Sequence, residues 1–267
     1  MRKRKNIVSK GLCKLTLKEG KYVESHILPR ALTMLNKRGE KAIQKEEGVL
    51  GKLRFQGWYD NQICIADGEK ILSDIDNKAI KILRKNQLVW SGWPTMLHSL
   101  TDDKIKLDEE QGLGYRLLTG LDWKALKLFF LSILWRAAVS EREDMKFVSL
   151  STDMIEVLRI ALINKDPLSV KEFPVRLYQI VTRGAAHNRT PIIEDFEISV
   201  PPFQFRKYKV CRIYLDGLIA HITLDPDDYL INTLKGVFLG VNDQTFIFAH
   251  KFENSRSFDN LISAISN

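Results

Sequence analysis

The residues best suited to chemistry in this chain lie between positions 20 and 80. His26 carries an imidazole whose ordinary pKa of about 6.5 lets it accept a proton close to neutral pH. Glu69 and Asp76 supply carboxylates, the ligands that hard divalent cations prefer. A base beside a cation could hydrolyse a phosphodiester, because the base activates water and the cation stabilises the developing charge. A lone histidine at a strand end can also have a purely structural role, in which its ring hydrogen-bonds to a backbone carbonyl.

Positive charge is concentrated in the same part of the chain. The net charge is +8, and residues 1–55 hold fifteen Lys or Arg against five Asp or Glu, whereas the rest of the chain holds twenty-six against twenty-eight. Such a local field attracts polyanions. It predicts a nucleic-acid partner, DNA or RNA with DNA ranked first, although a solvated basic face without a partner has the same pattern. The cations expected to grip phosphates are Lys14, Lys21, Arg30, Lys37 and Arg38.

Cysteine usage and hydropathy indicate the compartment. Cys13, Cys64 and Cys211 form no CxxC pair, and so sparse a count argues against a disulfide framework and for a reducing environment. The basic start of the chain is not followed by an apolar run of signal-peptide length. The most apolar stretch, 126–139, is interrupted by charges and is too short to span a bilayer. We expect a cytoplasmic protein without membrane association.

The elements that must position His26 and the carboxylates are a strand, a loop, a second strand and a helix. A short strand is predicted over 21–26, and the polar, glycine-containing stretch 36–57 is typical of a long loop. A second strand is predicted over 62–66. Apolar residues then recur every three to four positions from Ile71 to Leu83, which predicts an amphipathic helix.

The remainder of the chain changes character twice. Residues 86–121 are predicted to be a linker, because an aromatic turn over 88–94 is followed by the polar, glycine-containing stretch 99–121. Helices are predicted over about 123–141, apolar nearly all round, and about 152–164. From Pro174 onward short β-branched and aromatic runs predict strands, and Asp216-Gly217 is a two-residue hairpin signal.

Three segments of the first part together resemble the HNH endonucleases. They are Cys13-Lys14-Leu15-Thr16, Glu24-Ser25-His26-Ile27-Leu28-Pro29-Arg30, and Asn61-Gln62-Ile63-Cys64 before a helix opening at Gly68-Glu69. The resemblance covers roughly residues 12–84 and implies a ββα-metal fold. It also implies that His26 is the general base, that Asn61 orients it, and that Mg²⁺ or Mn²⁺ assists hydrolysis.

The sequence departs from the HNH pattern at two places. Many HNH proteins bind a structural zinc through two CxxC knuckles, but here Thr16 and Asp67 stand where the second cysteines would be, so no structural zinc is expected. The family's metal-binding His or Asn early on the helix is also missing. The ligands expected for the divalent cation are His26, Glu69, Asp67 and Asp76.

The second part of the chain has a resemblance of its own. Its segments are similar to parts of uncharacterised bacterial proteins that have an HNH-like N-terminus. The segments that carry this similarity are 129–136, 187–191 and 214–218. It implies no known activity for the second part.

These features together predict an α+β protein. A ββα-metal-like unit with a basic arm is expected over 1–85, a linker over 86–121, and helices followed by a mainly antiparallel β domain over 122–267. The leading hypothesis is a metal-dependent endonuclease that hydrolyses nucleic-acid phosphodiester bonds. Two alternatives stay open: a non-catalytic nucleic-acid-binding protein on the same scaffold, and a defence- or immunity-type module that binds a protein partner.

Overall fold

The computed structural model describes most of the chain. The described residues are 9–33, 42–45, 52–54, 58–101, 105–108, 110, 112–185, 187–200, 204–234, 236–255 and 258.

The first part of the described chain contains two small antiparallel strand pairs and one long helix. β1 (Lys10–Leu12) pairs with β2 (Glu19–Lys21), and β3 (Ser25–His26) pairs with β6 (Tyr59–Asp60). Helix α1 (Ala66–Lys85) follows. The expected order of strand, loop, strand and helix is therefore present. The second strand, however, lies before the predicted 62–66, because Ile63 and Cys64 extend along the turn after β1 instead, with their carbonyls accepting from Lys14 and Val23.

The stretch 36–57, predicted to be a loop, contains two strands. β4 (Ala42–Lys45) pairs antiparallel with β5 (Lys52–Arg54) and parallel with β10 (His187–Arg189). The partner of β4 lies far along the sequence, so no local pattern announces the pairing. This three-stranded sheet ties the first part of the chain to the second.

Helix α1 is amphipathic, as its spacing predicts. Leu72, Ile75, Ala79 and Leu83 are buried along one stripe, while acidic residues occupy the first turn and basic residues the last. Both charge placements complement the helix dipole. The buried stripe packs against α2 (Trp123–Val139).

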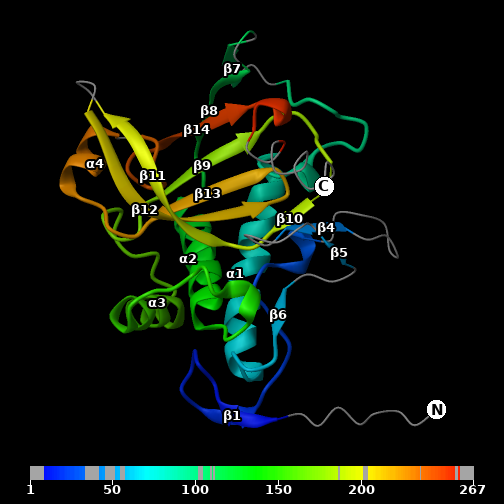
Figure 1. Cartoon of the computed structure of the whole chain (residues 1–267), viewed down its shortest axis with the longest axis vertical. Helices are drawn as coiled ribbons and strands as arrows, with labels where there is room; N and C mark the ends of the chain where they lie inside the picture. The colour runs from blue at the N-terminus through cyan, green and yellow to red at the C-terminus, as the bar shows by residue number, and fades with distance from the viewer. Residues whose placement is uncertain are drawn as a thin grey trace.

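Helix α2 is the centre of the molecule. Its N-cap Asp122 accepts a hydrogen bond from the Ala125 amide at 3.1 Å. The helix is apolar nearly all round because it contacts α1, α3 (Thr152–Asn164) and the large sheet at once. Figure 1 shows α1, α2 and α3 grouped beneath that sheet.

The large sheet has seven strands in the order β11-β12-β13-β9-β14-β8-β7. All neighbours are antiparallel except β9 and β14. The fold is therefore α+β with a mainly antiparallel sheet, as the sequence predicts. The strands are β7 (Ile105–Asp108), β8 (Leu113–Thr119), β9 (Val175–Ile180), β11 (Ile192–Val200), β12 (Gln204–Leu215), β13 (Leu218–Thr223) and β14 (Gln244–His250). The remaining elements are α4 (Asp228–Thr233), η1 (Arg30–Leu32), η2 (Trp90–Gly92), η3 (Glu143–Met145) and η4 (Phe252–Asn254).

The stretch 86–121 does not run as a free linker. It contributes β7 and β8 to the large sheet, where β8 pairs with β14. Trp90 is buried, its backbone amide donates to the Asp216 carbonyl at 2.9 Å, and its indole donates to the Ile180 carbonyl at 3.1 Å. The main hydrophobic core accordingly continues from Cys13 through α1 and α2 to the sheet. Across the described residues, no helix has the length and apolarity needed to cross a membrane.

Candidate functional site

His26 ends β3, opposite Tyr59 of β6. Its side chain is 27% exposed, and Nε2 lies 3.6 Å from Oε1 of Glu24. Burial lowers the pKa of His26, while the Glu24 carboxylate opposes that shift. The imidazole is therefore neutral at pH 7, partly open to solvent and able to accept a proton.

A buried arginine of α2 supports this strand from beneath. Arg136 donates to both carboxylate oxygens of Asp76 on α1, at 2.9 and 2.8 Å, and its Nη1 also donates to the His26 carbonyl at 2.6 Å. Burial raises the pKa of Asp76, and Arg136 offsets part of that shift. One guanidinium thus joins α1, α2 and β3, a role that the sequence signals only through a charge inside an apolar helix.

Glu69 faces the same strand from the first turn of α1. The Ser25 hydroxyl, which is fully buried, donates to Oε2 of Glu69 at 2.5 Å. Burial raises the pKa of Glu69, and the Ser25 hydrogen bond lowers it in part. Asp76 acts electrostatically on both His26 and Glu69, so these three predicted site residues belong to one cluster of ionisable groups.

Two other predicted site residues lie outside this cluster. Asn61 is exposed in the turn after β6, and among the described residues no hydrogen bond joins it to His26. Asp67 is exposed at the start of α1, where its Oδ2 lies 3.7 Å from Nζ of Lys18. The structure therefore brings His26, Glu69 and Asp76 together and leaves Asn61 and Asp67 apart.

The carboxylates of Asp76 and Glu69 already accept hydrogen bonds within the protein. Both oxygens of Asp76 accept from Arg136, and one oxygen of Glu69 accepts from Ser25. Over the part of the chain that the structure describes, no three His, Cys, Asp or Glu side chains are placed to hold one metal ion.

The predicted phosphate-binding cations have different surroundings. Lys14 is committed to the fold, since its ammonium donates to Glu141 and to the Val139 carbonyl, each at 2.8 Å. Arg30 is exposed shortly after His26 in the sequence, and its positive charge lowers the pKa of the His26 imidazole. Lys21 is exposed on β2, whereas Lys37 and Arg38 lie outside the described residues.

Lys21 has a neighbour that the sequence analysis missed. In the β1–β2 pair, Lys10 stands directly opposite Lys21, and both are exposed. Directly opposed residues of antiparallel strands place their side chains on the same face, where like charges repel. Figure 1 shows β1 at the end of the molecule remote from the large sheet.

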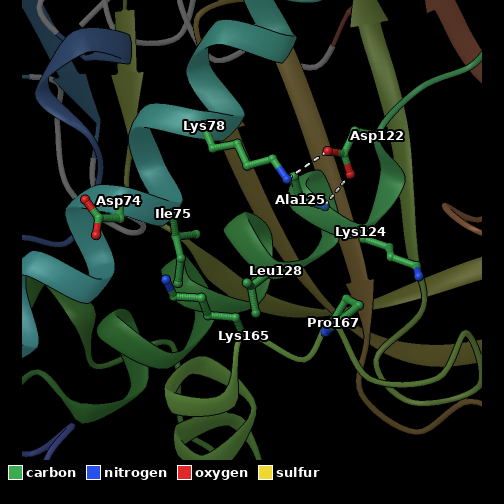
Figure 2. Close-up of a pocket in the computed structure, with 9 residues that line it drawn as sticks. All are labelled: Asp74, Ile75, Lys78, Asp122, Lys124, Ala125, Leu128, Lys165 and Pro167. Atoms are coloured by element: carbon green, nitrogen blue, oxygen red, sulfur yellow. Dashed lines mark hydrogen bonds and ion pairs between the residues drawn. The ribbon is translucent and has the colours of Figure 1, made fainter.

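A separate pocket of about 460 Å³ lies between α1, the start of α2 and the segment after α3. In Figure 2 its wall carries the ion pair between Lys78 and Asp122, 2.9 Å apart, above the apolar side chains of Ile75 and Leu128. The pocket contains none of the described residues of the predicted site. Both carboxylates of its lining already have partners, Asp122 in Lys78 and the Ala125 amide, and Asp74 in Lys70.

Comparisons with known proteins find no relative. No protein-family model, no curated protein and no solved structure matches the chain. Its function must therefore be argued from the sequence pattern and from the geometry of the cluster around His26.

Proposed function

We propose that this protein binds nucleic acid through the β1–β2 hairpin and the surface beside His26, without cleaving it. The observation that carries the proposal is the opposition of Lys10 and Lys21 across the hairpin. Two like charges held side by side cost energy in the free protein. A phosphate backbone lying on that face would remove the repulsion and add two ion pairs.

Nearby cations extend the same surface. Lys18, in the same hairpin, is exposed, and its distant pairing with Asp67 at the surface contributes little to stability. Arg30 is exposed beside His26. The excess of ten positive charges in residues 1–55 gives this end of the sequence a long-range attraction for polyanions.

The absence of turnover follows from how the carboxylates are used. Phosphodiester hydrolysis of the expected kind needs a carboxylate free to hold a cation near the base. Both carboxylate oxygens of Asp76 accept hydrogen bonds from Arg136, and one carboxylate oxygen of Glu69 accepts a hydrogen bond from Ser25. The scaffold therefore keeps a surface for phosphates but dedicates its acidic residues to structure.

A salt titration of duplex DNA binding tests the proposal. Each phosphate contact adds about 0.9 to the slope of log K against log salt, so Lys10→Gln/Lys21→Gln is expected to reduce that slope by about 1.8. Lys81→Gln/Lys85→Gln is the matched control, because it removes the same charge from exposed positions of α1. Equal slopes for the two double variants would refute the hairpin as the contact. Association that does not respond to salt would favour a protein partner instead.

Hydrolysis is a second candidate, favoured by the partly exposed neutral imidazole of His26 beside Glu24. In that reaction His26 would take a proton from water, whose oxygen would attack phosphorus while the bond to the leaving sugar oxygen breaks. Plasmid nicking with Mg²⁺ or Mn²⁺, compared between wild type, His26→Gln and the exposed control His98→Gln, tests this candidate. Cleavage lost only in His26→Gln would establish it and overturn the non-catalytic proposal. No cleavage by the wild type would exclude it.

A further inference from the structure

Two cysteines that are remote in sequence meet beneath the start of α1. The Lys14 amide donates to the Ile63 carbonyl at 2.8 Å, which brings the neighbouring residues Cys13 and Cys64 alongside each other. A Cβ atom added to Gly68 would lie 2.8 Å from the sulfur of Cys13 and 3.2 Å from that of Cys64. Both sulfurs thus approach the same point, and the two thiols hydrogen-bond to each other.

The sulfurs of Cys13 and Cys64 have different surroundings. Cys13 Sγ accepts a hydrogen bond from the Thr16 amide at 3.4 Å and lies against the amide of Ile65, the N-cap residue of α1. Amides at a helix start favour a thiolate. The Cys64 hydrogen bond lowers the pKa of Cys13 to about 4, and the same contact, with burial, raises the pKa of Cys64.

Thiol–disulfide exchange uses such a difference in pKa between two neighbouring cysteines. A stabilised thiolate attacks first, and a neighbouring thiol resolves the mixed disulfide that forms. Cys211 of β12 is fully buried, as Cys13 and Cys64 are, but it is not part of this pair, and burial raises its pKa to about 12.

We propose that Cys13 and Cys64 are a redox pair that closes into an intramolecular disulfide on meeting a small disulfide oxidant. The Cys13 thiolate attacks one sulfur of the oxidant, a mixed disulfide forms, and the first small thiolate leaves. Cys64 then loses its proton and attacks the Cys13 sulfur, and the second small thiolate leaves. The two protein thiols lose two electrons and two protons, and the oxidant becomes two thiols.

The pair lies beneath the first turn of α1. Gly68, in that turn, has no Cβ, and one added there would meet both sulfurs. The N-cap, Ile65, makes no side-chain hydrogen bond to the described helix. Cys13 and Cys64 are both fully buried, so a small oxidant would reach them by local opening of this turn.

Thiol counting and peptide mapping of the full chain test the pair, with glutathione disulfide as the probe. The wild type has three thiols and is expected to keep one, with Cys13 and Cys64 recovered in one cross-linked peptide. Cys211→Ser is the control and should form the same cross-link. Cys64→Ser should stop at a glutathione adduct on Cys13, whereas Cys13→Ser should form neither product.

A measurement on the unaltered protein keeps the proposal testable if a variant does not fold. Brief iodoacetamide treatment at pH 6 is expected to label Cys13 at least tenfold faster than Cys64 or Cys211, because only Cys13 is a thiolate at that pH. Equal labelling of all three, or three free thiols remaining after the oxidant, would overturn the redox pair.

Discussion

Replacing Arg136 by methionine should destabilise the protein strongly, because one guanidinium joins three elements. Methionine keeps the apolar stem that packs inside α2 but removes every donor. It leaves the Asp76 carboxylate, which is only 13% exposed, and the His26 carbonyl without their partners. The change therefore isolates the charge from the packing.

The expected loss of unfolding free energy is about 3–5 kcal/mol, the cost of removing one partner from a buried ion pair. The loss should depend on pH. Burial already raises the pKa of Asp76 above its ordinary 3.8, and the variant raises it further. A folded-state pKa above the unfolded one means that stability falls as pH rises through the interval between them. Arg136→Met should accordingly be less stable at pH 8 than at pH 5.

Urea unfolding, followed by tryptophan fluorescence at both pH values, measures the effect. Arg136→Met/Asp76→Leu should recover part of the loss, since it leaves no orphaned carboxylate. Lys70→Met, which breaks the exposed Lys70–Asp74 pair, is the control and should cost less than about 0.5 kcal/mol. The reasoning is refuted if Arg136→Met costs no more than this control, or if the double variant is no more stable than the single one.

Three further changes test other parts of the fold. Nε and Nη2 of Arg176 are buried without a hydrogen-bond partner among the described residues. Arg176→Met removes these atoms, so urea unfolding should give a free energy of unfolding about 1 kcal/mol higher than that of the wild type; a lower value would contradict this. Burial raises the pKa of Asp216 to about 6, so wild-type stability should fall from pH 4.5 to 7.5 by about 2 kcal/mol more than that of Asp216→Asn; parallel curves would contradict this. Gly217 has φ +83°, and a Cβ there would lie 2.4 Å from the Trp90 ring, so Gly217→Ala should lower the midpoint by several degrees in calorimetry; an unchanged midpoint would contradict this.

Local signals in the sequence were sufficient to predict several elements. The spacing of apolar residues from Ile71 to Leu83 and the cap at Asp122 correspond to α1 and α2, because helix periodicity and capping involve neighbours within four residues. Asp216-Gly217 forms the predicted hairpin turn between β12 and β13, with positive φ at both positions.

Pairings between distant segments were not predictable in this way. β4 meets β10, and β8 meets β14, across long separations in sequence. The stretches 36–57 and 86–121 consequently looked like a loop and a linker. Strand pairing depends on partners that the strand's own sequence does not identify.

The residues of the candidate site show the same difference between what local sequence and what distant contacts determine. The sequence alone placed His26, Glu69 and Asp76 in one part of the chain, with an excess of positive charge nearby. Only the tertiary structure decided that Asp76 is held by Arg136, sixty residues away, and that Glu69 accepts from Ser25, forty-four residues away. It also set Cys13 against Cys64 and Lys10 opposite Lys21. Residue type fixes what a side chain can do, whereas packing fixes which charges and donors it meets, and that decides what it does.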